Sequence, residues 1–167
     1  TNTLYVITHD YEHIDLFSIV KIFHNILKKA AKVHLIFYNA WWNKLLHWFY
    51  KKDFKSGSVL YTGTGLVDKS VNLLNQNNNV LIFKYKENTS TGIYHIAKLS
   101  KCKVVLVKIK CRKKIEKNHY NSSKLEVLLS YVNEDFDITI EDFKEEPTNS
   151  SEYLDKIRNS LYDLNLH

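Results

Sequence analysis

Short apolar runs recur along the chain and alternate with segments in which apolar side chains return every three or four residues. Several of the runs are apolar at consecutive positions, which is typical of strands buried on both faces of a parallel sheet. The segments between them have the spacing of amphipathic helices. The predicted strands cover residues 4–8, 33–38, 58–62, 80–84 and 104–109.

Four helical segments separate these strands. The first has Asp15 near its start and two lysines at its end, charges that complement a helix dipole. Strands that alternate with helices favour a mostly parallel sheet with helices on both faces. We therefore predict a three-layer α/β fold with five or six strands. The four predicted helices lie within residues 14–29, 41–52, 67–74 and 93–99.

The pattern changes after Lys110. Residues 111–124 are basic and polar, as in a linker, and residues 125–132 have helical spacing. A short alternating run at 137–140 predicts a sixth strand at a sheet edge, and a closing helix is expected over 153–164. We predict one domain over residues 1–167, with the basic linker and a C-terminal extension over 125–167.

Length and composition narrow the class of protein. The chain has 167 residues, of which 44% are hydrophobic and 25% charged, as in a globular domain. Two cysteines are too few for a disulfide framework or a common zinc site. No apolar run reaches the roughly 20 residues of a membrane span, and the first residues do not resemble a signal peptide. These features predict a cytoplasmic or nuclear protein that is not secreted and does not contact a membrane.

The charge balance favours a polyanionic partner. Twenty-four basic residues against 18 acidic ones give a net charge of +6, which attracts nucleic acid through its phosphates. The alternative is compositional, because a Lys- and Asn-rich sequence is also what an AT-rich genome encodes. If nucleic acid is the partner, Trp42 is a candidate for base stacking. The candidate phosphate contacts are Lys108, Lys110, Arg112, Lys113, Lys114 and Lys117.

Three carboxylates follow predicted strands or turns at one edge of the sheet. They are Asp10, Asp68 and Glu87. Ligands of parallel α/β sheets bind outside the carboxyl ends of the strands, and clustered carboxylates there hold Mg²⁺ or Mn²⁺. Such metals activate water for phosphodiester hydrolysis. The alternative is that these acids cap helices.

Two loops at the same predicted edge are candidates for phosphate binding. The first is Gly63-Thr64-Gly65, which follows a strand and precedes a helix, so its backbone amides can cradle an anion. It lacks the third glycine of a dinucleotide fingerprint, and a plain tight turn is the alternative. The second contains Ser90 and Thr91, whose hydroxyls could bind a phosphate. The alternative is that these residues form an N-cap cluster at the start of the following helix.

From the second strand onward the sequence resembles the NYN branch of the PIN-like nuclease superfamily. The resemblance rests on Tyr38-Asn39-Ala40-Trp41 and on the run from Gly63 to Leu74, and it covers about 100 residues. Asp68 matches one acid of that family, while Thr8, Asn72 and Thr89 are neutral where the family has acids. The resemblance implies a PIN-like, Rossmann-like domain that binds RNA or single-stranded nucleic acid.

The same resemblance bears on catalysis. An active protein would be a ribonuclease dependent on Mg²⁺ or Mn²⁺, with Asp10, Asp68 and Glu87 as catalytic metal ligands. The neutral positions favour weak or no nuclease activity and no bound cofactor.

Two alternatives stay open at this point. The turn at Gly63 and Gly65 with Asp68, followed by Ser90-Thr91-Gly92, is also similar to the SLOG nucleotide-binding superfamily. That similarity implies a domain for a nucleotide or ribose phosphate. The other alternative is a structural module with protein partners in a viral or RNA-processing assembly.

Overall fold

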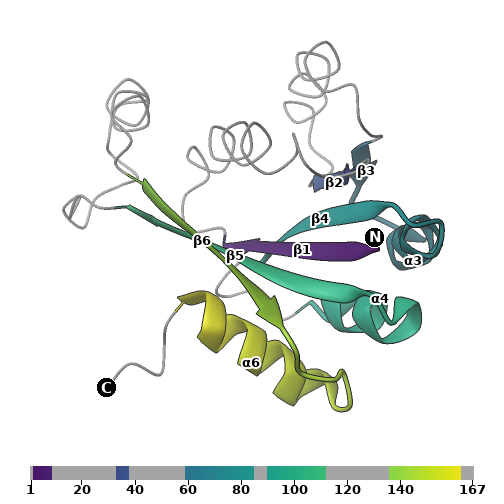
Figure 1. Ribbon diagram of the computed structural model, residues 1–167. Helices are drawn as coiled ribbons and strands as arrows, with labels where there is room; N and C mark the ends of the chain where they lie inside the picture. The colour runs from purple at the N-terminus through teal and green to yellow at the C-terminus, as the bar shows by residue number, and fades with distance from the viewer. Residues whose placement is uncertain (1, 9–32, 38–58, 85–89, 112–135, 163–167) are drawn as a thin grey trace, which may run out of the picture.

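The computed structural model describes residues 2–8, 33–37, 59–84, 90–111 and 136–162. They form a six-stranded sheet with helices packed on it (Figure 1). The spatial order of the strands is β3-β2-β4-β1-β5-β6. The strands are β1 (Thr3–Thr8), β2 (Val33–Phe37), β3 (Val59–Tyr61), β4 (Asn79–Lys84), β5 (Lys103–Cys111) and β6 (Phe136–Phe143).

The sheet confirms the predicted fold class. β1 to β5 are parallel to one another, and only β6 runs antiparallel, beside β5. The chain moves one way across the sheet from β1 to β2 to β3 and then reverses through β4 to β5. The β3-to-β4 and β4-to-β5 connections cross the sheet in the same direction, so right-handed crossovers place α3 (Leu66–Asn75) and α4 (Gly92–Ser100) on the same face. A mostly parallel sheet with helices packed on it is the α/β class that the alternating pattern predicts.

The structure differs from the sequence prediction mainly at strand ends. β4 begins at Asn79, one residue early, because the Asn79 side-chain oxygen accepts a hydrogen bond from the Thr3 amide at 3.0 Å and joins β4 to β1. β5 continues through Cys111, the first residue of the predicted linker. β6 is twice as long as predicted and pairs with β5 from Val104↔Phe143 to Cys111↔Phe136.

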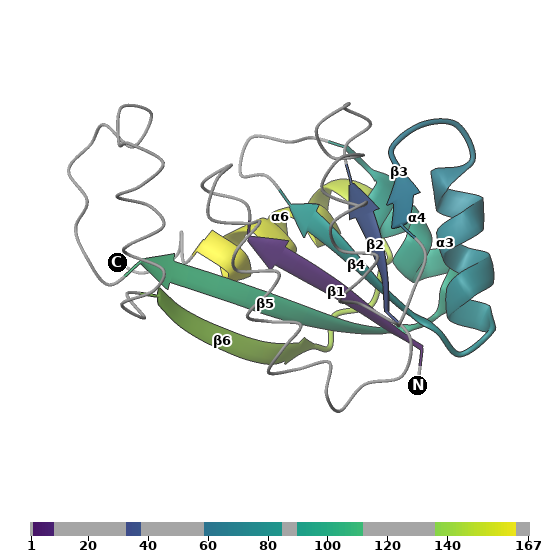
Figure 2. The same cartoon turned by 90° about the horizontal axis from the view of Figure 1, so that it is seen from above.

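Three helices occur in the described ranges, and all lie on one face of the sheet (Figures 1 and 2). They are α3 (Leu66–Asn75), α4 (Gly92–Ser100) and α6 (Ser150–Tyr162). Their apolar stripes pack Leu74, Ile96 and Ile157 against Val6 and Leu106 of the sheet, all with 0% exposure. Each such side chain contributes roughly 1.5–3 kcal/mol by leaving water. The predicted helices within 14–29, 41–52 and 125–132 lie outside the described residues.

α6 crosses this face from the amino edge of the parallel strands to their carboxyl edge. It begins at Ser150, three residues before the predicted start, because the Asn149 side chain caps it by accepting from the Glu152 amide at 3.1 Å. At its far end the Tyr162 hydroxyl donates to the Lys84 carbonyl at 2.6 Å. One helix therefore contacts both edges of the sheet. None of the helices in the described ranges is long and apolar enough to span a membrane.

Candidate functional site

A small cavity opens at the carboxyl edge of the sheet, between the first turns of α3 and α4. Its volume is about 150 Å³. The walls are apolar side chains of β2, β4 and α4, among them Ile36, Ile82 and Ile93. Its polar lining comes from Thr62, Lys84 and Ser90. We call this space the carboxyl-edge cavity. Of the predicted phosphate-binding residues only Ser90 lines it, while Gly63, Thr64, Gly65 and Thr91 are not in its lining.

The turn after β3 is confirmed as a tight turn. Gly63 and Gly65 have φ angles of 152° and 77°, which favour glycine, and the Leu66 amide donates to the Gly63 carbonyl at 3.3 Å. None of the described atoms lies within 4 Å of where a Cβ would stand on either glycine, so backbone conformation is what favours glycine here. The turn connects β3 to the start of α3 at the carboxyl edge of the sheet. Thr62 lines the cavity there, and Thr64 of the turn is exposed.

The loop before α4 caps that helix differently from the sequence expectation. Thr91 occupies the N-cap position but its side chain makes no capping hydrogen bond. Instead the Ser90 hydroxyl accepts from the Gly92 amide at a long 3.5 Å. Ser90 and Gly92 both line the carboxyl-edge cavity. The first turn of α4 therefore presents its positive dipole end to this space.

Lys84 is the feature of this edge that the sequence reading missed. It ends β4 with 3% exposure and lines the cavity. Burial lowers its pKa from the usual 10.5, the Arg158 guanidinium lowers it further, and the Asp155 carboxylate opposes both. A buried ammonium is costly unless opposite charge compensates it. The available signal was a lysine directly after an apolar strand, at the edge where parallel sheets bind ligands.

Neighbouring strands place two further polar residues beside Lys84. Thr8 pairs with Lys84 in the β1–β4 register, and Lys108 is one residue beyond the Ile7↔Val107 pair of β1 and β5. Thr8 is buried, and Lys108 is bound to Glu141 of β6 with Nζ and Oε2 3.1 Å apart. Lys108 is thus already neutralised by a cross-strand acid. Lys110 lies in β5, and its side chain falls outside the described part.

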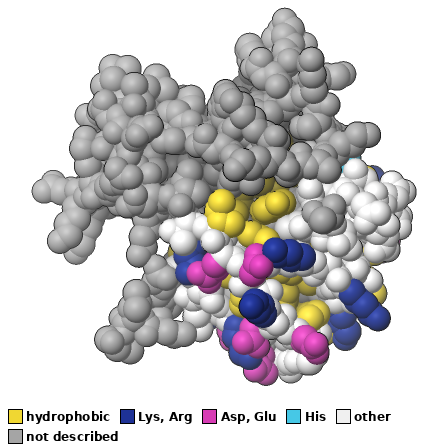
Figure 3. Space-filling view, in the orientation of Figure 1, with side chains coloured by type: hydrophobic (Ala, Val, Ile, Leu, Met, Phe, Trp, Pro, Cys, Tyr) yellow, Lys and Arg dark blue, Asp and Glu magenta, His cyan; other side chains and the backbone are white. Residues whose placement is uncertain are grey.

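The described surface over β6 and α6 is mixed in sign (Figure 3). Lys103 binds Asp142 at 2.9 Å, and Lys156 binds both Glu145 and Glu152 at 3.0 and 3.1 Å. Exposed pairs of this kind add little stability. They do remove much of the positive potential that a continuous basic patch would have. The predicted contacts Arg112, Lys113, Lys114, Lys117 and Trp42 lie outside the described residues.

The structure describes one of the three predicted metal ligands. Asp68 is exposed in the first turn of α3, where a carboxylate complements the helix dipole. Asp10 and Glu87 lie outside the ranges that the structure describes. Within those ranges no group of three or more His, Cys, Asp or Glu side chains could hold a metal ion.

The sequence matches no family model, and it matches no curated protein. The functional conclusion therefore depends on the geometry of the carboxyl edge. That edge combines a buried ammonium, two hydroxyl side chains and the amide ends of two helices. These groups donate hydrogen bonds and positive charge, which is what a phosphate group accepts.

Proposed function

We propose that the protein is a nucleotide-binding α/β domain that holds a phosphate group in the carboxyl-edge cavity. The observation that carries this proposal is that Thr62, Ser90 and Lys84 line one cavity at the first turns of α3 and α4. Helix N-termini and lysine are recurrent phosphate ligands in α/β proteins.

The size of the cavity limits what part of the ligand enters it. Pockets that enclose a drug-sized ligand typically measure roughly 300–1,000 Å³, against about 150 Å³ here. A phosphate group fits such a space, and the sugar and base would lie outside it along the sheet edge. The ligand would therefore be anchored by its phosphate, and its base would contribute less.

Single-stranded RNA is the second candidate ligand, and a specific observation favours it. β5 ends at Cys111 on the same carboxyl edge, and the basic run from Arg112 to Lys117 follows directly in the chain. This run and the net charge of +6 would attract a phosphate backbone. On this hypothesis the domain binds RNA with weak or no cleavage, because Thr8 is a neutral residue at the end of β1.

The test is a binding experiment with three probes: inorganic phosphate, a nucleoside monophosphate and a single-stranded oligoribonucleotide. We expect each to raise the melting temperature, because a ligand that binds only the folded protein stabilises it. Lys84→Gln should abolish the shift given by phosphate and by the monophosphate. The matched control is Lys69→Gln, which removes an exposed lysine of α3 that does not line the cavity.

The same experiment separates the two candidate ligands. A monophosphate that binds as tightly as the oligonucleotide, with a shallow dependence on salt, would identify a free-nucleotide site. Tighter oligonucleotide binding with a steep salt slope would identify RNA, since each released counterion adds to the slope. If none of the three probes shifts the melting temperature, or if Lys84→Gln leaves the shifts unchanged, the proposal is wrong.

A further inference from the structure

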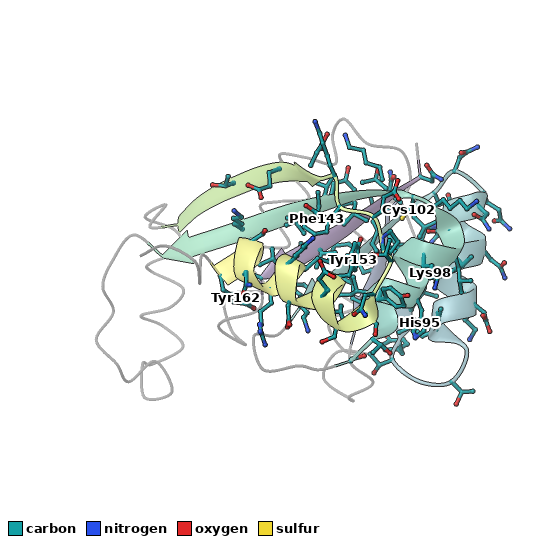
Figure 4. All side chains as sticks on the ribbon, turned by 90° about the horizontal axis from the view of Figure 1, so that it is seen from below. His95, Lys98, Cys102, Phe143, Tyr153 and Tyr162 are labelled. Carbon is teal, nitrogen blue, oxygen red and sulfur yellow. The ribbon has the colours of Figure 1, made fainter. Side chains whose placement is uncertain are left out.

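The outermost strand, β6, has one edge that no described strand covers. It pairs with β5 on one side and, within the described part of the chain, with no strand on the other. Figures 2 and 4 show it on the outside of the sheet. β6 has eight residues, more than the roughly five or six of a typical strand. The outward backbone N–H and C=O groups of such an edge can pair with a further strand.

The middle of β6 carries an exposed apolar side chain. Phe143 packs edge-on against Tyr153 of α6, with ring centroids 5.4 Å apart, so it faces the helices (Figure 4). Side chains alternate along a strand, so Ile140, three residues earlier, lies on the opposite face of the sheet. Ile140 is 48% exposed; among the described residues the other exposed large hydrophobic side chain is Leu99 of α4. An exposed β-branched residue on an edge strand favours pairing with another strand.

Two acids of β6 are neutralised by lysines of β5. The Lys108 Nζ atom is 3.1 Å from a carboxylate oxygen of Glu141, and Lys103 is 2.9 Å from Asp142. Unpaired charge on an edge strand normally keeps other strands away. Here Glu141 and Asp142 already have counterions on the neighbouring strand. An approaching strand therefore meets ion pairs at these positions and no unpaired acid.

The sequence of β6 favours one register for antiparallel pairing with a second copy. A twofold axis normal to the sheet keeps side chains of one face together when it passes between a residue and its own copy. With the axis at Ile140, Glu141 faces Thr139 of the second copy, and no acid of β6 opposes another. With the axis at Thr139, Glu141 would face Asp137, and with the axis at Glu141 it would face its own copy. Registers farther along the strand pair fewer residues, and like charges directly opposite one another destabilise a strand pair.

We propose that two copies of the chain pair through β6, antiparallel and with Ile140 opposite Ile140 of the second copy, so that one sheet continues across the dimer. The pairing covers the exposed isoleucine of each copy and uses the outward backbone groups of the strand. One strand edge is a small interface, so we expect a dissociation constant in the micromolar range or weaker. This inference is independent of the nucleotide proposal, because no residue of β6 lines the carboxyl-edge cavity.

The first experiment measures molar mass by analytical ultracentrifugation at protein concentrations from micromolar to millimolar. We expect a reversible equilibrium between monomer and dimer. Ile140→Lys should weaken the dimer at least about tenfold, because it removes apolar contact and sets two ammonium groups opposite one another. Leu99→Lys is the matched control, since it replaces an exposed hydrophobic side chain away from β6 and should leave the equilibrium unchanged. Both positions are exposed, so neither variant should melt far from the wild-type temperature.

The second experiment tests the register by disulfide cross-linking with diamide as the oxidant. Residues directly opposite in an antiparallel pair have Cα atoms roughly 4.5–5.5 Å apart, within reach of a disulfide. Ile140→Cys should therefore form a covalent dimer. Thr139→Cys should not, because its own copy lies two residues out of line in this register. The wild-type chain, which contains Cys102 and Cys111, gives the background rate.

Three outcomes would overturn the proposal. The first is a chain that stays monomeric at millimolar concentration, which would favour a strand from another protein, or no partner, at this edge. The second is a dimer that Ile140→Lys leaves unchanged. The third is cross-linking of Thr139→Cys as fast as that of Ile140→Cys.

Discussion

The two edges of the sheet differ in the charge of their buried polar side chains. The carboxyl edge has a cavity of about 150 Å³ with a buried ammonium, Lys84, beside it. The amino edge has a cavity of about 490 Å³ whose buried polar group, Tyr153, is neutral. A larger cavity is thus paired with the weaker charge. Of these two cavities the amino-edge one has the larger volume, whereas the buried positive charge lies beside the smaller one.

The difference follows from which element closes each edge. Parallel strands leave helix N-termini at the carboxyl edge, so that edge has positive potential before any side chain is added. The amino edge is closed instead by β6 and the 144–149 segment, whose acids pair with lysines of β5 and α6. α6 contacts both edges, through Tyr153 at the amino edge and Tyr162 at the carboxyl edge, so its tyrosines and core residues are a means of testing the comparison.

The largest expected effect comes from removing the residue that fixes α6 to the sheet. Ile157 is fully buried in the core cluster. Ile157→Ala should lower the free energy of unfolding by about 2–5 kcal/mol, because it leaves a cavity as well as losing apolar burial. Urea denaturation measures this value. Leu99→Ala is the control, since Leu99 is 59% exposed and its loss should cost under about 0.5 kcal/mol. Equal effects would mean that α6 is not held as described.

The second prediction concerns alkaline pH. Burial, reinforced by nearby Cys102, raises the pKa of Tyr153 to about 12 in the folded protein, against 10.0 for an ordinary tyrosine. Between these values the unfolded chain loses its proton first, so stability should fall as pH rises through this window. A tenfold shift in ionisation equals about 1.4 kcal/mol, so the loss is on the order of 2 kcal/mol.

Comparison with Tyr153→Phe isolates this contribution from the many lysines that titrate nearby. The difference in unfolding free energy between the variant and the wild type should be constant below pH 10.0 and grow in favour of the variant above it. A difference that stays flat up to pH 12 would show that the Tyr153 hydroxyl is not desolvated.

Most of the fold was predictable from the sequence, for reasons visible in particular strands. Runs such as Val104 to Val107 have no polar face, and only a sheet covered on both sides accommodates them. The length of β6 was not predictable, because Glu141 and Asp142 read as a polar stretch until lysines of the neighbouring strand pair with them. Strand pairing between distant segments leaves no local signal of that kind.

The candidate sites were predictable in part. Ser90 lines the carboxyl-edge cavity, and Gly63 and Gly65 form the turn after β3, as expected because strand ends and turn residues are local features. Lys84 was missed as a functional candidate, since burial of a lysine depends on what α6 covers. That property cannot be read from spacing along the chain.

The third prediction compares the two tyrosines of α6. The Tyr162 hydroxyl donates to the Lys84 carbonyl, so Tyr162→Phe should cost roughly 0.5–1.5 kcal/mol. The Tyr153 hydroxyl has no partner in the described part, so Tyr153→Phe should cost nothing near neutral pH. Thermal denaturation of the two single variants gives the contrast directly. If both variants lose the same stability, the two ends of α6 are chemically alike and the comparison fails.

The smallest expected effect is the pH response of the carboxyl edge, opposite in sign to that of Tyr153. The pKa of Lys84 is lowered by burial and by Arg158, so its charged form is disfavoured in the folded state. The penalty is fully present below its folded pKa and is relieved as pH rises toward the usual 10.5. Wild-type stability relative to Lys84→Met should therefore rise over that interval.

Saturating inorganic phosphate decides whether this response belongs to an anion site. An anion beside the ammonium favours its charged form, so phosphate should raise the pKa of Lys84 and flatten the rise in wild-type stability relative to Lys84→Met. Sodium chloride at equal ionic strength is the control for general screening. Flattening by both salts alike would indicate screening of surface charge. Flattening by phosphate alone would place the anion against Lys84, at the edge with the smaller cavity.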